Sequence, residues 1–348
     1  MQRIKTALLS YGMSGRVFHA PFIHMHPGFE LVGAWERSKK LIQEAYPGVK
    51  SYASMEELLA DDVDLVIVNT PSYTHYEYAK KALLEGKHLI IEKPLTTTAA
   101  EGEELKKIAA EKGKLIFPYQ NRRWNSDYLT VKKVLDEKLL GDIVEAEIRY
   151  DRFNATLSYK LHKETPGPGA GIVYDLSPHL IDQALQLFGW PTDVFADIMI
   201  TRPDSKVDDY FEILLYYPTL RVRLKAGYFV REAPAGYSLF GTKGTFLKSR
   251  ADVQEDDLLA GKKPDMPNWG IEPVSAQGLL HTEKDGKVIR EKIPTEKGDY
   301  MQYFDGVYKT LTQGAPLPVN VDQATDVIRI IEAAFLSSKE GRVVSVKR

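Results

Sequence analysis

Cysteine is missing from this 348-residue sequence. Its absence excludes disulfide bonds, thiolate metal sites and cysteine nucleophiles, and it is typical of a reducing compartment, so we expect a cytoplasmic protein. An excess of one charge is also missing, because 46 Lys and Arg residues face 48 Asp and Glu residues, and the formal net charge is -2. The sequence has no block of basic residues that could bind the phosphates of a nucleic acid, so we expect no nucleic-acid partner.

Long hydrophobic runs are lacking as well. The longest candidates, such as Leu65 to Val68, have the length of a strand, far below the roughly 18 residues that a membrane span needs. The apolar run Ala7 to Leu9 near the amino terminus is too short for the core of a signal peptide. We therefore expect neither a membrane protein nor an exported one. The length predicts two domains, since it exceeds the size at which a single core usually stops growing.

Residues 1–122 alternate short apolar runs with amphipathic segments, which is typical of a doubly wound parallel sheet of the Rossmann type. One helix is expected from Thr74 to Leu84, with Gly86 as its C-cap. The expected strands are Ile4 to Leu9, Glu30 to Trp35, Val63 to Asn69, His88 to Ile91 and Lys114 to Tyr119.

Residues 123–348 show the period-2 alternation of antiparallel strands, so we predict an α+β domain with a large, mostly antiparallel sheet. Asp285 and Gly286 predict a hairpin turn between Leu279 to Glu283 and Lys287 to Ile293, inside an otherwise loop-like stretch from 250 to 299. A last helix is expected from Asp322 to Lys339. The other expected strands run through Val144 to Tyr150, Asp193 to Thr201, Tyr210 to Tyr217, Leu220 to Phe229 and Val343 to Val346.

A glycine-rich turn follows the first expected strand. The segment from Ser10 to Gly15 is the dinucleotide-binding pattern GxGxxG with Ser10 in place of its first glycine. Gly12 would let a pyrophosphate approach the backbone, and Gly15 would allow close packing of the next helix. Met13 and Ser14 complete the predicted cofactor contacts. A turn that uses its glycines only for geometry is the alternative interpretation.

An acidic residue, Glu36, directly follows the second expected strand. It lies 21 residues after Gly15, which is the spacing at which a carboxylate binds the adenosine ribose. The neighbouring Arg37, Ser38 and Lys39 could instead bind the extra phosphate of NADP. Because Glu36 would repel that phosphate, NAD is slightly favoured over NADP as the cofactor. A solvated loop carboxylate is the alternative.

Polar residues follow several strands at the carboxyl edge of the expected sheet, where ligands bind in open α/β folds. Lys93 stands between Glu92 and Pro94 directly after one strand, and we expect its ammonium group to face this crevice. A solvated lysine is the alternative. Another strand end adds three further candidates for cofactor contacts, which are Thr70, Pro71 and His75.

A helix expected to begin at Asp175 carries Asp175, His179 and Asp182 on one face. A histidine beside carboxylates suits general acid/base work near neutral pH, although a polar helix face with an Asp–His pair is also a common structural arrangement. Metal binding would need further ligands, and the remaining histidines are scattered, so no metal is expected.

Together, these sites resemble the Gfo/Idh/MocA family, named after glucose-fructose oxidoreductase and inositol dehydrogenases. The resemblance rests on three motifs: the glycine turn, the Glu92-Lys93-Pro94 triplet, and the glycine-rich segment from Gly167 to Gly171. The last of these leads into the helix with Asp175 and His179. The flanking residues are similar to the branch that contains NADP-dependent scyllo-inositol dehydrogenases. Ser10, Ala170, Ser177 and Ser72 depart from the usual pattern without removing a catalytic side chain.

The resemblance implies an NAD(P)-dependent dehydrogenase acting on a secondary alcohol of an inositol, polyol or sugar. Lys93 would polarise the reacting oxygen, His179 would take the hydroxyl proton, Asp175 would hold the substrate or tune Lys93, and Arg123 and Asp182 would bind substrate hydroxyls. A homodimer or homotetramer formed through the second sheet is implied too. The family also contains glycosidases that oxidise their substrate transiently and regulators without catalysis, and both remain alternatives.

Overall fold

The computed structural model describes residues 3–37, 39–158 and 161–347. The chain forms two compact units whose segments alternate along the sequence. Unit 1 comprises Met1–Asn121, Gln254–Trp269 and Asp299–Thr325, and unit 2 comprises Arg122–Val253, Gly270–Gly298 and Asp326–Arg348. The sequence predicted one division, into 1–122 and 123–348, whereas the structure gives two later segments of the chain to unit 1.

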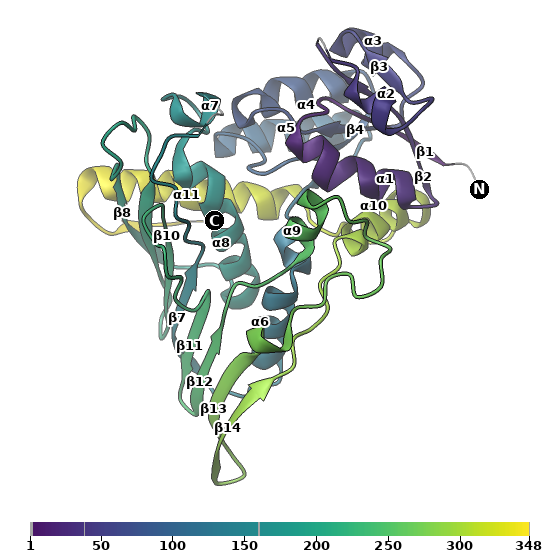
Figure 1. The fold of residues 1–348 in the computed structure, drawn as a ribbon. Helices are drawn as coiled ribbons and strands as arrows, with labels where there is room; N and C mark the ends of the chain where they lie inside the picture. Colours follow the sequence, from purple (N-terminus) through teal and green to yellow (C-terminus); the bar gives the residue numbers. More distant parts are fainter. Residues whose placement is uncertain (1–2, 38, 159–160, 348) are drawn as a thin grey trace. The chain divides into compact units, whose positions relative to one another are not determined.

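Unit 1 is built on a six-stranded parallel sheet in the order β3-β2-β1-β4-β5-β6, as predicted for a doubly wound fold (Figure 1). This order reverses between β1 and β4, where such folds bind their ligands. The strands are β1 (Ile4–Leu8), β2 (Phe29–Trp35), β3 (Lys50–Tyr52), β4 (Leu65–Val68), β5 (His88–Ile91) and β6 (Ile116–Pro118). The short strand β3 escaped prediction because its three residues carry no apolar pattern.

Helices lie along both faces of this sheet, and each face has its own core. Against one face pack Leu58, Leu83 and Leu105 with the apolar side chains of β4 and β5. On the other face Phe22 stacks on Phe304 at 5.1 Å between ring centroids. The helices of unit 1 are η1 (Gly15–His19), α1 (Ala20–Met25), α2 (Leu41–Ala45), α3 (Met55–Ala60), η2 (Ser72–Thr74), α4 (His75–Leu84), α5 (Ala99–Glu111), α9 (Gln254–Leu259) and α10 (Met301–Gln313). The sequence reading placed α9 within surface loop and did not identify α10.

Unit 2 is built on a nine-stranded sheet in the order β14-β13-β12-β11-β7-β10-β9-β8-β15. All neighbouring strands are antiparallel except β7 and β10, so the predicted sheet type is confirmed. The hairpin at Asp285 and Gly286 is present, with both residues at positive φ. The strands are β7 (Ile143–Arg149), β8 (Asp193–Met199), β9 (Tyr210–Tyr216), β10 (Arg221–Gly227), β11 (Tyr237–Gly241), β12 (Gly244–Lys248), β13 (Gly278–Lys284), β14 (Lys287–Ile293) and β15 (Val344–Ser345).

Helix α8 (Gly171–Phe188) packs on one face of this sheet, against β7, β9 and β10. The hydroxyls of Ser337 and Ser338 in α11 (Val321–Glu340) accept backbone hydrogen bonds from β8, which fixes that helix on the sheet. Unit 2 also contains α6 (Ser126–Asp136), α7 (Leu161–Glu164) and η4 (Val274–Ala276), while η3 (Asn121–Trp124) spans the change of unit. Helix α8 begins at Gly171, four residues before the predicted start.

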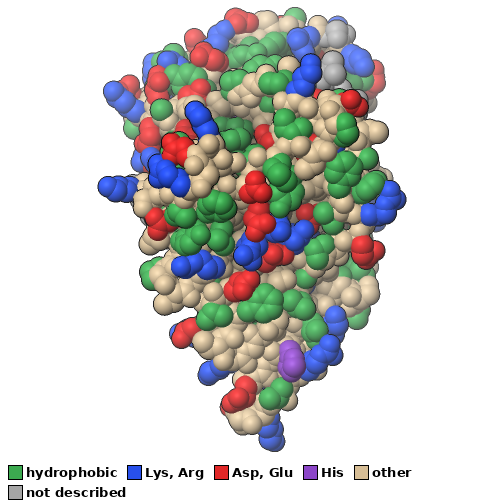
Figure 2. All heavy atoms as spheres, turned by 90° about the vertical axis from the view of Figure 1, so that its left-hand side faces the viewer, with side chains coloured by type: hydrophobic (Ala, Val, Ile, Leu, Met, Phe, Trp, Pro, Cys, Tyr) green, Lys and Arg blue, Asp and Glu red, His purple; other side chains and the backbone are tan. Residues whose placement is uncertain are grey.

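The opposite face of the nine-stranded sheet carries alternating charged and apolar side chains and is seen in Figure 2. Its ion pairs join strands, as in the contacts of Arg223 with Glu212 and Glu145. Between them lie exposed apolar side chains, including Phe195 and Phe240, each 37% exposed. Across residues 3–37, 39–158 and 161–347, the structure contains no helix with the length and apolar character needed to cross a bilayer.

A buried ion pair joins β12 to the segment before η4 inside unit 2. The ammonium group of Lys248 lies 2.5 Å from the carboxylate of Glu272, and both side chains are fully buried. Lys248 also donates to the carbonyl of Ala276 at 2.8 Å, and the hydroxyl of Ser126 lies 2.6 Å from the other carboxylate oxygen. These contacts supply the hydrogen bonds that buried charges require.

Removing one member of this pair should destabilise the protein strongly. We expect Glu272→Leu to lower the free energy of unfolding by about 3–5 kcal/mol, because the Lys248 ammonium stays buried without its carboxylate. The double variant Lys248→Met with Glu272→Leu should recover much of this loss, since no charge is left inside. Urea denaturation measures both effects.

The matched control is the exposed pair of Lys132 and Asp136. Breaking it with Asp136→Asn should cost at most about 1 kcal/mol. A double variant no more stable than Glu272→Leu would contradict the interpretation of a coupled buried pair.

Candidate functional site

The predicted glycine turn lies between β1 and η1, at the carboxyl end of β1 and beside β4. The backbone N–H of Ser10 donates to the Asn69 side chain at 3.0 Å, and the amide of Asn69 donates to the Ser10 carbonyl at 2.7 Å. The Ser10 hydroxyl accepts the N–H of Gly12 at 3.1 Å, so this serine supports the turn where the usual pattern has glycine. Asn69 ends the expected strand from Val63 to Asn69, so it lies at the edge where polar strand ends were predicted to meet.

Glycines 12 and 15 serve the turn differently. A Cβ on Gly15 would lie 2.3 Å from the carbonyl oxygen of Ser10, so only glycine allows η1 to begin this close to β1. A Cβ on Gly12 would meet only the Ser10 hydroxyl, at 3.3 Å, and otherwise open space. Gly15 therefore has the packing role that the pattern predicts. The open surface at Gly12 leaves room for a ligand.

The carboxylate of Glu92 connects this turn to the end of β5. It accepts hydrogen bonds from the hydroxyl of Ser14 and, at 2.9 Å, from the imidazole of the fully buried His19. Burial alone would raise the pKa of Glu92, but the hydrogen bond and charge of His19, together with Ser14, outweigh burial and hold this pKa at about 2. Glu92 is thus ionised at neutral pH. Its hydrogen bonds hold in place the chain segment directly before Lys93.

Lys93 follows β5 directly and is partly exposed at the edge where the glycine turn lies. The Lys93–Pro94 peptide bond is cis. His75 is buried beneath this segment, with its ring nitrogens 2.8 Å from the carbonyl of Pro94 and 2.9 Å from that of Thr70. Burial lowers the pKa of His75, while its hydrogen bonds with the two carbonyls act in the opposite direction. His75 therefore holds two strand ends together, while Thr70 and Pro71 are partly exposed there.

Glu36 has a structural task that the sequence did not reveal. Its carboxylate accepts the backbone N–H groups of Leu41 at 3.0 Å and Ile42 at 3.3 Å, and the hydroxyl of Ser51 at 3.0 Å. It therefore caps the amino end of α2, where a negative charge is favourable. Arg37 beside it is exposed. Ser38 lies outside the described residues.

The glycine-rich entry to α8 in unit 2 is explained by a carboxylate. Gly171 has φ +86°, and a Cβ there would lie 2.2 Å from an oxygen of Asp208. Asp208 accepts the N–H of Val173 at 2.7 Å and so caps the helix. Burial raises the pKa of Asp208 to about 6, against the opposing effect of this hydrogen bond.

The predicted polar face of α8 is buried rather than solvated. His179 is 5% exposed and Asp182 is 2% exposed. Asp175 lies one turn before His179, and its carboxylate forms ion pairs with Lys163 at 2.8 Å and Arg152 at 3.8 Å. Neither cation can be recognised from the spacing along α8, because both lie in other segments of the chain.

Arg123 and Asp182, predicted to bind substrate hydroxyls, are joined to each other. Two guanidinium nitrogens of Arg123 lie 2.9 and 2.6 Å from the Asp182 oxygens. Such a bidentate pair fixes the guanidinium plane. The pair therefore anchors η3 to α8, and contact with a substrate stays a prediction.

The segment that carries Lys163 is held by a buried arginine. Arg202 contacts Asp209 and Glu164, each at 2.9 Å, and it donates to the carbonyl of Thr156 at 3.0 Å. Glu164 neighbours Lys163, so Arg202 fixes the backbone that presents Lys163 to Asp175. No spacing in the sequence indicates this network.

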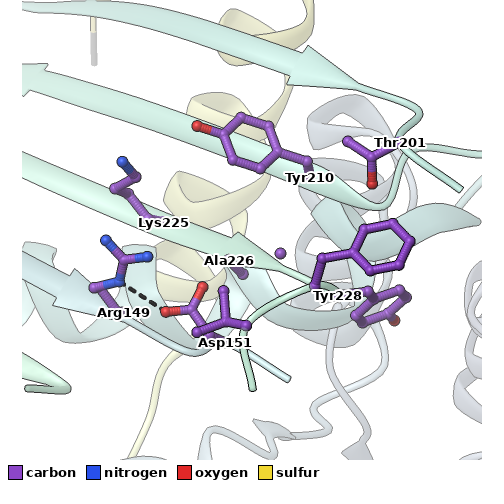
Figure 3. Close-up of a pocket in the computed structure, with 10 residues that line it drawn as sticks. Arg149, Asp151, Thr201, Tyr210, Lys225, Ala226 and Tyr228 are labelled. Carbon is purple, nitrogen blue, oxygen red and sulfur yellow. Dashed lines mark hydrogen bonds and ion pairs between the residues drawn. The ribbon is translucent and has the colours of Figure 1, made fainter. Parts of the chain in front are cut away.

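A hollow of about 200 Å³ lies at the carboxyl end of β10. Figure 3 shows Arg149, Lys225 and Tyr210 around it, with Arg149 paired to Asp151. These three side chains belong to the sheet face away from α8. In the part of the chain that the structure describes, no three His, Asp or Glu side chains are grouped as a metal site requires.

Comparisons with known proteins assign both parts of the chain. Residues 4–120 match the sequence model of the oxidoreductase family with an NAD-binding Rossmann fold, and residues 132–346 match that family's C-terminal alpha/beta domain. The chain is 38% identical over 345 residues to scyllo-inositol 2-dehydrogenase (NADP(+)) IolW of Bacillus subtilis, covering 99% of this chain and 96% of that protein.

Solved structures agree with this assignment. The oxidoreductase yvaA of Bacillus subtilis superposes with a TM-score of 0.96 at 37% identity, covering 99% of both chains. A structure from Bacteroides fragilis, described as an oxidoreductase, has a TM-score of 0.90 at 46% identity and covers 99% of this chain and 100% of that one. The chain therefore belongs to the Gfo/Idh/MocA oxidoreductase family.

Proposed function

We propose that this oxidoreductase transfers a hydride between a nicotinamide cofactor and a secondary alcohol of an inositol, polyol or sugar. One observation carries the proposal. Lys93 follows β5 at the sheet edge where the glycine turn lies. The carboxylate of Glu92, the residue before Lys93, accepts a hydrogen bond from Ser14 of that turn. The name of the Bacillus subtilis relative, an inositol dehydrogenase, supports the substrate class.

The residues of unit 1 fit a dinucleotide. The turn from Ser10 to Gly15 lies where the strand order reverses, and the open side of Gly12 leaves its backbone accessible. Thr70 and Pro71 belong to the neighbouring strand end. When bound, the nicotinamide cofactor supplies the hydride acceptor or donor. The chain itself binds, orients and moves the proton.

We assign Lys93 to hold and polarise the reacting oxygen, and His179 to take the hydroxyl proton. A positioned cation stabilises the negative charge that develops on that oxygen. Asp175, which pairs with Lys163 and Arg152, is assigned to hold the substrate or to tune Lys93. Arg123 and Asp182 fix the first turn of unit 2 against α8.

Two substitutions test these roles. Lys93→Met should lower the rate of alcohol oxidation by about 10² to 10³, and His179→Ala by about 10² to 10⁴, both without loss of cofactor binding. In the unmutated protein, oxidation should rise with pH as the imidazole loses its proton and becomes able to accept one. The rising limb should disappear in His179→Ala.

The assay screens scyllo-inositol, other inositols and monosaccharides with NAD and NADP, followed by absorbance of the reduced nicotinamide. Lys112→Met, at the exposed end of α5, is the matched control and should leave the rate unchanged. Near-normal turnover in Lys93→Met, or an unchanged rising limb in His179→Ala, would remove that residue from the mechanism.

For the cofactor, we propose NADP rather than NAD. The slight preference for NAD expected from the sequence required a Glu36 carboxylate turned to the ribose, whereas this carboxylate caps α2. The exposed cations Arg37, Lys39 and Lys40 follow directly. A 2′-phosphate would find opposite charge there, and the Bacillus subtilis relative is named for NADP.

Arg37→Ala should weaken NADP binding about tenfold, because a hydrogen bond to a charged group is lost, and should leave NAD binding nearly unchanged. Fluorescence titration of both cofactors measures this selectivity, with Lys112→Ala as the control. Tighter binding of NAD than NADP by the unmutated protein would reject the proposal.

We also propose that the helix-free face of the nine-stranded sheet joins copies of this chain into a homodimer or homotetramer. Supporting this are the exposed Phe195, Met199 and Phe240 on that face, and a hollow of about 200 Å³ among its charged side chains. Exposed apolar side chains rimmed by charges are typical of protein interfaces.

The variant Phe195→Glu with Phe240→Glu should separate the copies, because it places four or more carboxylates in a closed interface. The molar mass measured by light scattering coupled to size-exclusion chromatography should then fall toward the 39.3 kDa of one chain. Leu84→Glu, on the exposed side of α4, should leave the mass of the oligomer unchanged. A single-chain mass for the unmutated protein would contradict the proposal.

A further inference from the structure

Three arginines surround one aromatic ring in unit 2. The guanidinium carbons of Arg250, Arg152 and Arg122 lie 4.5, 5.3 and 5.7 Å from the ring centroid of Tyr150, which follows β7. The imidazole of His179 is 6.4 Å from the same ring, between centroids. We call Arg122, Arg152, Arg250 and Tyr150 the Tyr150 cluster. It lies beside the proposed catalytic histidine.

The buried end of this cluster has an unused hydrogen-bond donor. Arg250 donates to the carbonyl of Arg149 at 2.8 Å and to the side-chain oxygen of Gln183 at 3.4 Å, both of which are uncharged. Its Nη1 atom is buried and has no hydrogen-bond partner within the described part of the chain. A buried donor on a charged group is costly to leave unmade. An anion would supply the missing acceptor.

The exposed end of the cluster adds a fourth cation. Arg152 and Lys163 have side chains 36% and 39% exposed, and both contact the carboxylate of Asp175. The other carboxylates nearby are already engaged, since Asp182 pairs with Arg123 and Asp127 accepts the backbone N–H groups of Tyr128 and Ala251. Arg250, Arg152 and Lys163 thus bring three cations to this part of unit 2, and two of them share the carboxylate of Asp175.

We infer that the substrate carries an anionic group, a carboxylate or a phosphate, which the Tyr150 cluster and Lys163 bind while His179 acts on a hydroxyl group. The inference rests on the proposed function and narrows its substrate class to acidic polyols or sugars. Guanidinium groups match the planar oxygens of such anions and can bind two of them at once. The ring of Tyr237 also lies 4.8 Å from the Arg250 guanidinium, but aromatic faces do not supply the charged hydrogen-bond acceptor that an anion offers.

The test compares substrates that differ in charge. D-glucuronate carries a carboxylate, D-glucose 6-phosphate carries a phosphate, and D-glucose and scyllo-inositol are neutral. With the preferred cofactor, kcat/KM for one of the two acids should exceed that for the neutral compounds about tenfold to a hundredfold. The advantage should shrink as KCl is raised, because salt screens the attraction. The acid that is preferred identifies the anionic group.

Variants assign the effect to the cluster. Lys163→Gln and Arg152→Gln should each reduce the ratio of acidic to neutral kcat/KM about tenfold, and Arg152→Lys should retain more of that ratio than Arg152→Gln. The control Arg342→Gln removes an exposed, ion-paired arginine of the same unit and should keep the ratio. Circular dichroism checks that each variant is folded. Thermal stabilisation of the unmutated protein by the preferred acid gives a readout independent of turnover.

Each alternative has its own outcome. Equal or better use of neutral substrates, or an unchanged ratio in both variants, would overturn the inference while leaving the dehydrogenase function intact. Weaker cofactor binding with an unchanged ratio in Arg152→Gln would assign the cluster to a cofactor phosphate instead, and also overturn it. Failure to oxidise any of the four compounds with either cofactor, despite thermal stabilisation by an acid, would reject the proposed reaction and not the anion site.

Discussion

A buried carboxylate organises the proposed cofactor edge of unit 1. Glu92 receives hydrogen bonds from Ser14, at the start of η1, and from His19, at its end, and it immediately precedes Lys93. Its charge is kept at neutral pH because these partners outweigh the cost of burial. The glycine turn and the lysine thus depend on a single ionised group. Neither could move by itself without breaking a hydrogen bond to it.

Sequence patterns were enough for the architecture and for the placement of this edge. Apolar runs fixed β1, β4 and β5 to within a few residues, and parallel strands bring their carboxyl ends to one side of a sheet. The turn after β1 and the lysine after β5 could therefore be placed together before any coordinates. Periodicity also separated the parallel sheet from the antiparallel one, because strands covered on both faces lack alternation.

The tasks of individual side chains could not be predicted in the same way. Glu36 has the spacing of a ribose ligand, but the N–H groups of α2 compete for its oxygens. The sequence shows the polar face of α8 but not the segments that bury it. Arg152 and Arg250 reach the helix from the segments that follow β7 and β12, and the ion pairs of Arg202 hold the segment that carries Lys163. Helical spacing carries no information about such partners.

The discontinuity of unit 1 affects how the chain folds during synthesis. Phe22 of α1 and Tyr119 after β6 pack against Tyr303 and Phe304 of α10, and Ala324 belongs to the core on the opposite face of the sheet. Ribosomes add roughly 5–20 residues per second, so these partners emerge on the order of ten to forty seconds after Asn121. Until then the early residues of unit 1 lack these packing partners. Completion of the first unit thus waits for nearly the whole polypeptide.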